Sequence, residues 1–276
     1  MAIELAAWNV AKGLGIDERA PQVLEGIKRL DADVVVLSEA WATDDNTSPD
    51  FIHEVIGRTM EFAGRYGYRS YDPVPYKDAD TTRHGAPAGF EQYLLVMGRE
   101  NPAVRWAQPI RLGTRNALSM HVTDPQAHHD VYMIGAHFDD RSEALRLGMA
   151  SALLKRIDLQ RPFVLAGDLN AMHHDARSAR FLRSKLAEMA ASHLPGDRAK
   201  WLGSRLLEMG DGRTMGMLAR AGLKEADPKH QRTFTFSHVR FGQMDHIMTN
   251  RVVTDQFKTH KLPGSDHRAI SARIRS

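Results

Sequence analysis

The 276-residue chain has no cysteine, which excludes disulfides, thiolate metal sites and cysteine nucleophiles. It also lacks the HExxH zinc motif, the GxSxG serine-hydrolase motif and a glycine-rich nucleotide loop after any expected strand. No apolar run approaches the ~20 residues of a membrane span, and the opening MAIELAAWNV lacks the basic-then-apolar pattern of a secretory signal. We therefore expect a cytoplasmic protein without a membrane anchor.

The composition is sufficient for a large core, since 42% of the residues are hydrophobic. We expect a single domain over residues 1–276, with a helical insertion at about 175–223. The 37 basic and 34 acidic residues leave a formal net charge of +3. This balance permits an anionic substrate but does not by itself identify one.

Apolar periodicity predicts alternating strands and helices. Strands are expected at Ile3–Trp8, Val34–Leu37, Tyr93–Met97, Val104–Leu112, Leu118–Thr123, Val131–Ala136, Phe163–Ala166, Thr233–Phe236, Met244–Thr249, Val252–Phe257 and His267–Ile274. Helical spacing occurs at Glu18–Leu30, Asp50–Ala63, Arg141–Asp158 and most of Asp175–Leu223, while Asp72–Ala88 is expected to be a long loop. Strand blocks separated by single helices in two halves predict an α/β (α+β) protein, a four-layered sandwich of two packed, mainly antiparallel sheets flanked by helices.

Polar side chains follow the first two expected strands. Glu39 emerges from the buried run Val34–Leu37, and its carboxylate suits a hard cation such as Mg²⁺. Asn9 ends the first strand, where its amide can brace Glu39, ligate the metal or simply form a turn. These two residues are candidates for one metal site.

The sequence GDLNA places Asp168 and Asn170 two residues apart after another apolar strand. Gly167 allows close backbone approach, so both side chains can face one cleft. An aspartate there can orient or deprotonate water, and an asparagine can hydrogen-bond a phosphoryl oxygen without repelling it. The alternative is an Asx-type turn.

Histidines and aspartates at later strand ends complete the set. A buried aspartate such as Asp245 or Asp266 would favour the protonated form of His267, which could then stabilise or protonate a phosphate, and His137 could contact the same group. Zinc is the competing metal because the chain has 14 histidines, but the motif positions are mostly oxygen donors, which favour Mg²⁺ or Mn²⁺. The pairs His128–His129 and His173–His174 are interpreted as loop residues.

In chain order, AWNV, VVVLSEA, IGAHFDDRSEALR, LAGDLNA, QMDHI and GSDHRAI resemble the motifs of the endonuclease/exonuclease/phosphatase superfamily, the deoxyribonuclease-I-like metal-dependent phosphoesterases. The resemblance spans nearly the whole chain and implies a deoxyribonuclease-I-like fold and in-line attack of a metal-assisted water on a phosphate ester. The roles it implies are metal ligation by Glu39 with Asn9 and Asp266, water activation by Asp168, phosphate binding by Asn170, phosphate binding or protonation by His267 paired with Asp245, transition-state stabilisation by His137, and phosphate contact by Arg141. Arg146 is expected on the helix surface or in a structural role.

Two departures from the family pattern point to unusual substrate contacts: His246 stands where an aromatic residue is usual, and Gln243 near a common basic position. The leading hypothesis is a nuclease acting on DNA or RNA, because the isoelectric point is about 9.1 and arginines recur in the 175–223 stretch, although such arginines also suit a solvated helix face. The alternative is a phosphatase or phosphodiesterase of a small molecule or lipid headgroup, of inositol-phosphate or sphingomyelinase type. A non-catalytic binding domain is less favoured, because it would be expected to lose Glu39, Asp168 or His267. The sequence does not identify a protein partner.

Overall fold

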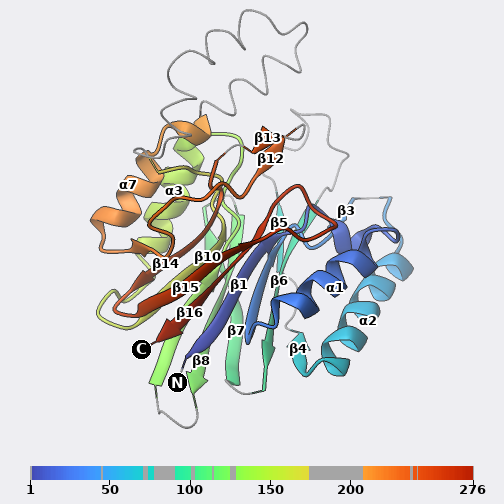
Figure 1. The fold of residues 1–276 in the computed structure, drawn as a ribbon. Coiled ribbons are helices and arrows are strands. Elements are labelled where there is room, and N and C mark those ends of the chain that lie inside the picture. The colour runs from blue at the N-terminus through green and yellow to red at the C-terminus, as the bar shows by residue number, and fades with distance from the viewer. Residues whose placement is uncertain are drawn as a thin grey trace, which may run out of the picture.

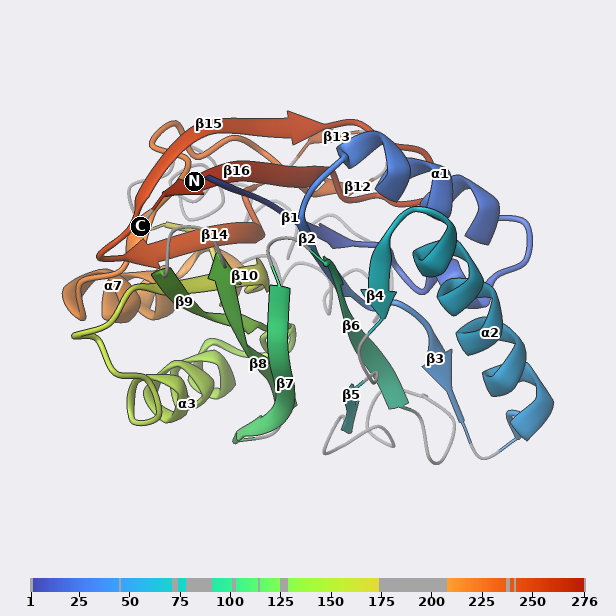
Figure 2. The ribbon, with the colours of Figure 1, turned by 90° about the horizontal axis from the view of Figure 1, so that it is seen from below.

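Two β-sheets lie face to face, and helices cover both outer sides (Figures 1 and 2). The computed structural model describes residues 2–44, 46–70, 74–77, 91–100, 103–113, 115–124, 129–173, 208–236, 239–240 and 242–275. The first sheet runs in the order β15 (Val253–His260), β16 (Ala269–Arg275), β1 (Ile3–Asn9), β2 (Val34–Ser38), β6 (Glu91–Arg99) and β3 (Ala42–Thr43), and β4 (Tyr68–Ser70) and β5 (Val74–Lys77) also pair with β6. The second runs in the order β11 (Lys224–Glu225), β14 (Asp245–Asn250), β10 (Phe163–Asp168), β9 (His129–Gly135), β8 (Arg115–Asp124) and β7 (Ala103–Leu112).

Most strand pairs in both sheets are antiparallel. The parallel pairs among the described strands are β1 with β2 and β9 with β10. A separate two-stranded element joins β12 (Thr235–Phe236) to β13 (Val239–Arg240). The architecture is therefore the predicted four-layered sandwich of two mainly antiparallel sheets flanked by helices.

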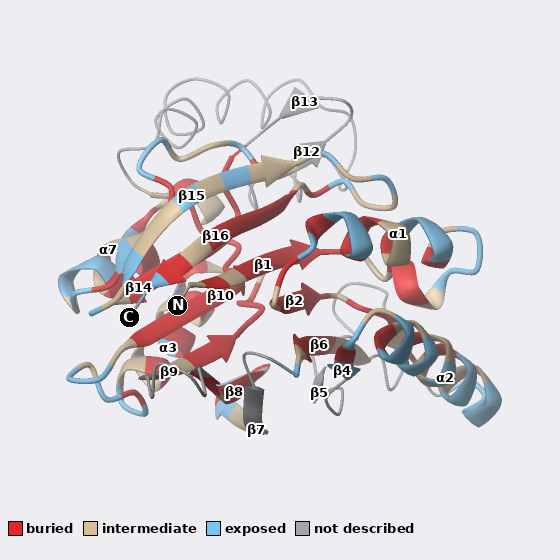
Figure 3. Cartoon of the chain, turned by 60° about the horizontal axis from the view of Figure 1, so that its bottom comes forward, coloured by how far each residue is buried: buried red, intermediate tan, exposed pale blue. Residues whose placement is uncertain are grey.

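The alternation of side chains along each strand divides the core into layers. On β1, Leu5 and Ala7 face the other sheet, whereas Ala6 and Trp8 face the helices. The inter-sheet layer is completed by residues of β2, β10 and β16, including Val36, all buried. Figure 3 shows this burial concentrated in the central strands, while the edge strand β15 is mostly intermediate or exposed. Each buried aliphatic side chain contributes about 1.5–3 kcal/mol to the free energy of folding, so this apolar layer holds the two sheets together.

The first sheet is covered by α1 (Ala20–Leu30) and α2 (Pro49–Arg65), and the second by α3 (Glu143–Leu154) and α7 (Arg213–Arg220) (Figure 2). Gly26 allows α1 to sit directly on the sheet, because a Cβ there would lie 2.8 Å from the ring of Trp8. Ser142 caps α3 by accepting a hydrogen bond from the backbone N–H of Leu145 at 3.2 Å. Within the described ranges, no helix is both long enough and apolar enough to cross a membrane.

The structure differs from the sequence expectations in several elements. The expected loop Asp72–Ala88 contains the strand β5, and the short strands β3, β4 and β11 were not predicted because two to four residues give too weak a periodic signal. The helix expected at Arg141–Asp158 spans Glu143–Leu154, and the Ser142 cap sets its beginning. Of the expected helical stretch 175–223, residues 175–207 and their arginines lie outside the described residues, and the remainder contains α7.

Candidate active site

Polar residues from both sheets meet at one end of the inter-sheet core. The pairing of β10 with β14 places Asp168 directly opposite Asp245. Asp168 shares a strand face with Val164 and Ala166, and Asp245 shares one with Ile247, so both carboxyl groups project toward the first sheet. Asn9 projects from the end of β1 on the face of Leu5 and Ala7. The strand ends thus assemble a polar cluster where the apolar layer stops.

Asn9 links two carboxylates. Its Nδ2 donates to Glu39 Oε1 at 3.1 Å and to Asp168 Oδ2 at 2.9 Å. Its Oδ1 accepts from the backbone N–H of Ala11 at 2.9 Å. Because that backbone group can only donate, it fixes which end of the amide faces the carboxylates. This orientation favours the bracing alternative for Asn9 over direct metal ligation.

Glu39 stands just beyond β2 with a left-handed backbone, φ 49°. Its Oε2 accepts from Gln92 Nε2 at 2.9 Å, and 21% of its side chain is exposed. Glu39 is therefore a carboxylate held by two amides with one side open to solvent. Sequence reasoning missed Gln92, because it gives no signal until β6 is aligned beside β2.

Asp168 is almost completely buried at 1% exposure. Gly167 makes this position possible, because its φ is 136° and a Cβ there would lie 2.0 Å from the carbonyl oxygen of Ala136. Burial, reinforced by the nearby charge of Asp245, raises the pKa of Asp168 to about 6, even though His267 and the Asn9 hydrogen bond act in the opposite direction. Asp168 can therefore accept a proton near neutral pH.

His267 and Asp245 form a buried ion pair with Nδ1 and Oδ2 2.8 Å apart. Burial lowers the pKa of His267, but the carboxylates of Asp245, Asp168 and Asp266 together outweigh burial and raise it to about 10. The other ring nitrogen, Nε2, lies 3.9 Å from Asp168 Oδ2. A charged proton donor thus stands beside a proton acceptor. The remaining Asp245 oxygen, Oδ1, is buried without a hydrogen-bond partner among the described residues.

His137 and Asn170 form a second polar pair. Asn170 Nδ2 lies 3.0 Å from His137 Nε2 and donates to the carbonyl oxygen of Phe138 at 3.0 Å. Burial, together with the charges of Arg115 and His267, places the pKa of His137 well below its usual range, so this ring is neutral. His137 Nε2 lies within 3.8 Å of Glu39 and 3.7 Å of Asp168, at the edge of the same cluster.

Asp266 and Arg141, two further residues predicted for the site, have surroundings that differ from those of the buried cluster. Asp266 is exposed, unlike its neighbour His267, and its Oδ1 lies 3.4 Å from Ser265 Oγ. Arg141 is paired with Asp139, with Nη2 and Oδ2 2.9 Å apart, so a phosphate contact would have to compete with that bond. Arg146 is fully buried against Glu143, which makes it structural and excludes the helix-surface interpretation.

The donor set suits a hard divalent cation. Glu39, Asp168 and Asp245 concentrate carboxyl groups in a poorly solvated space, and the imidazolium of His267 neutralises one charge. Oxygen atoms of Asp168 and Asp245 and a nitrogen of His267 lie within 4.8 Å of one another. A Mg²⁺ or Mn²⁺ ion next to the partly exposed Glu39 would offset further negative charge while keeping several waters. The residues present therefore fit such an ion.

A model of the Endonuclease/Exonuclease/phosphatase family matches residues 6–267. The chain belongs to this family, whose members are generally hydrolytic phosphoesterases and typically depend on a divalent metal. No curated protein matches the sequence.

Solved structures with the same fold come from distant relatives. An endonuclease/exonuclease/phosphatase from Beutenbergia cavernae is 18% identical, with a TM-score of 0.70 over 99% of this chain and 71% of the other. The human Nocturnin catalytic domain with bound sulfate is 15% identical, with a TM-score of 0.60 over 99% and 93% of the two chains. Truncated TDP2 from Caenorhabditis elegans is 13% identical, with a TM-score of 0.58 over 100% and 98%. At these identities the likeness is one of fold.

Proposed function

We propose that the protein is a divalent-metal-dependent phosphodiesterase that acts on DNA or RNA. The observation that carries the proposal is the meeting of Asp168 with the Asp245–His267 ion pair, beside Glu39 and Asn9. This arrangement offers a proton acceptor, a proton donor and a carboxylate for a metal at one end of the inter-sheet core. Together these three groups can promote the hydrolysis of a phosphate ester by water.

Mg²⁺ or Mn²⁺ would be held by Glu39, with Asp266 as a further ligand implied by family resemblance, and would supply Lewis-acid stabilisation of the phosphate charge. Asn9 holds Glu39 and Asp168 in a fixed relation through its two hydrogen bonds. Bracing of this kind limits the movement needed to reach the transition state.

Asp168 acts as the base and His267 as the acid. Asp168 Oδ2 takes a proton from the attacking water as the new P–O bond forms, and the bond to the leaving oxygen breaks. His267 Nε2 gives its proton to that oxygen, while Asp245 stabilises the imidazolium through Nδ1. Asn170 holds a phosphoryl oxygen in place of one of its present bonds to His137 or Phe138. Arg141 adds a phosphate contact when it exchanges part of its bond to Asp139.

The nucleic acid assignment is supported by the formal net charge of +3, which favours approach of a polyanion. The sulfate bound to the Nocturnin catalytic domain shows that this fold can hold a tetrahedral anion. The same catalytic groups would also serve a small phosphate ester or a lipid headgroup, and these are outcomes that the experiment must separate.

The test is hydrolysis of single- and double-stranded DNA, abasic DNA, RNA, inositol phosphates and sphingomyelin, with Mg²⁺, Mn²⁺ or chelator. Asp168→Asn keeps the size of the side chain but removes the base, so kcat should fall by about 10²–10⁴-fold. Asp17→Asn changes an aspartate with an 81% exposed side chain and should leave kcat unchanged. Chelator-resistant cleavage, full activity in Asp168→Asn, or no cleavage of any substrate by the wild type would overturn the proposal. Activity confined to the small ester or the lipid would overturn its substrate.

A further inference from the structure

Adjacent residues on β14 serve opposite faces of the sheet. Asp245 faces the inter-sheet layer with Ile247, so His246 points to the other side, where Met248 packs in the layer of α3 and α7. Glu225 reaches the same face, because β11 pairs with β14 in a register that sets Glu225 opposite Met248. His246 therefore does not replace an aromatic residue on the catalytic face.

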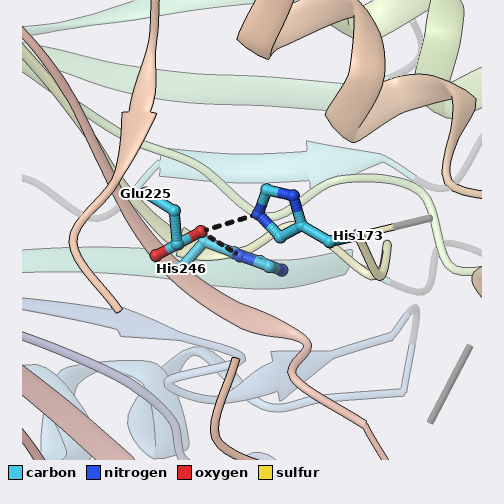
Figure 4. Close-up of side chains that lie close together, drawn as sticks. All are labelled: His173, Glu225 and His246. Carbon is cyan, nitrogen blue, oxygen red and sulfur yellow. Dashed lines mark hydrogen bonds and ion pairs between the residues drawn. The ribbon is translucent and has the colours of Figure 1, made fainter. Parts of the chain in front are cut away.

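His173 joins these two side chains from the segment after β10 (Figure 4). Glu225 Oε2 lies 2.7 Å from His246 Nδ1 and 3.2 Å from His173 Nε2. The three candidate ligand atoms all lie within 4.8 Å of one another. His173 lies in a loop, as the sequence predicted, and its ring belongs to this cluster.

The hydrogen-bond partners of His246 require a positive charge at its ring, from either a second proton or a metal ion. Its Nε2 lies 2.8 Å from the carbonyl oxygen of Ala171, which can only accept, so Nε2 carries a proton. Its Nδ1 faces a second acceptor, the Glu225 carboxylate. A neutral imidazole has one N–H and cannot satisfy both, so either the ring is doubly protonated or a metal ion lies at Nδ1.

Glu225 supplies an independent observation. Its side chain is only 5% exposed, and its second oxygen, Oε1, is buried without a hydrogen-bond partner among the described residues. A buried carboxylate oxygen without a partner loses its hydration without any compensating bond. Oε2 is the oxygen that faces both histidines, and a metal ion bound by both oxygens of this carboxylate would also satisfy Oε1. His173 has 14% of its side chain exposed and offers a route for the ion to enter.

We propose that His173, Glu225 and His246 form a second metal site, distinct from the catalytic cluster, that binds Zn²⁺ or a similar divalent transition metal. Two imidazoles and one carboxylate are an established zinc donor set. Tetrahedral bonds of about 2.0–2.1 Å place neighbouring ligand atoms about 3.3 Å apart. The two separations from Glu225 Oε2, 2.7 and 3.2 Å, are slightly shorter than this, and the two imidazole nitrogens lie within 4.8 Å of each other. The hydrogen bond from His246 Nε2 to the carbonyl oxygen of Ala171 is the kind of outer contact that usually orients a ligating histidine. The ring of His230 lies against that of His173, tilted by 35°, with ring centroids 4.3 Å apart.

The site would join the segment after β10 to β14 and β11, two strands that already pair with each other. His173 lies three residues beyond Asn170, and His246 directly follows Asp245. A bound ion therefore ties the loop that carries Asn170 to β14 and β11. Binding to the folded state alone stabilises a protein by about 2.7 kcal/mol when the free metal is at 100 times its Kd.

The experiment uses Glu39→Gln as the background, because this change removes the expected principal ligand of the catalytic metal. After chelator treatment and its removal, Zn²⁺ is titrated by calorimetry, and the thermal midpoint is measured with and without metal. The background protein should bind one equivalent of Zn²⁺ at the second site and melt at a higher temperature in its presence. Co²⁺ in place of Zn²⁺ should give the visible absorption of a tetrahedral ion.

His173→Ala in this background removes a partly exposed ligand and should weaken Zn²⁺ binding by at least about 100-fold, beyond what loss of an outer contact causes. Glu225→Gln should do the same, with folding checked by circular dichroism. His53→Ala removes an exposed histidine on α2 and should bind as the background does. No Zn²⁺ binding in the background, or equal affinity in the His173→Ala and His53→Ala proteins, would overturn the second site. Neither result depends on the substrate, so the proposed function is tested separately.

Discussion

Asparagine in place of Asp245 should lower the pKa of His267 and slow hydrolysis. The substitution keeps the size of the side chain and an oxygen that can accept from Nδ1, 2.8 Å away in the wild type. It removes the nearest of the carboxylate charges that raise the pKa of His267 from 6.5 to about 10 against burial. The variant therefore isolates the electrostatic part of the interaction.

The size of the effect follows from the geometry. An opposite charge at hydrogen-bonding distance shifts a pKa by about 1–3 units, and each unit is worth about 1.4 kcal/mol, so the charge of Asp245 stabilises the imidazolium by about 1.4–4 kcal/mol. Because folding raises the pKa of His267, this stabilisation is complete below pH 6.5 and is lost as pH rises through about 10. Loss of the charged acid should also reduce kcat by about 10²–10⁴-fold.

The assay is an NMR titration of the histidine ring protons in metal-free protein, with His267→Gln used to assign the signal. The pKa of His267 should fall by about 1–3 units in Asp245→Asn. His260 provides an internal control, because its Nε2 lies 2.8 Å from the uncharged Ser271 hydroxyl and its titration should not change. An unchanged titration of His267 would refute the electrostatic argument. A lowered pKa with unchanged kcat would refute its role as the acid.

Two further predictions concern stability. Burial raises the pKa of Asp139, but its contacts with Arg115 and Arg141 outweigh burial and lower the pKa below 3.8. The ionised Asp139 carboxylate therefore stabilises the folded protein above pH 3.8, and this contribution is lost as pH falls through the pKa of Asp139 in the folded state. Asp139→Asn should therefore destabilise the protein at pH 7 by about 3–5 kcal/mol and flatten the acid limb of denaturant unfolding, whereas an unchanged acid limb would contradict this assignment. Gly167→Ala should lower the free energy of unfolding by at least about 3 kcal/mol in the same assay, because the added Cβ would clash with Ala136. Gly148→Ala is the control, because its Cβ would enter open space on α3, and it should raise the free energy of unfolding by up to about 1 kcal/mol. Similar free energies of unfolding for these two variants would contradict the steric argument.

Much of the framework was predictable because strand periodicity is local. The run Val34–Leu37 and the alternation around Leu5 in β1 are fixed by which residues must be buried, and both strands lie where predicted. The same logic placed Asp168 at the end of an apolar strand, although the strand includes it. The short strands β3, β4 and β11 were not predicted, and the helix ends differ from those predicted, because a cap or one pairing partner decides these boundaries.

The sequence by itself determined the class of fold and the residue types at the strand ends, because apolar periodicity and motif order are properties of neighbouring residues. Only the tertiary structure decided which of these side chains meet. The register between β10 and β14 set Asp168 opposite Asp245, and the stacking of the sheets brought Asn9 to Asp168. The alternation of side chains along β14 also points His246 away from the catalytic face and toward Glu225. These contacts depend on pairing between distant segments, which no local pattern specifies.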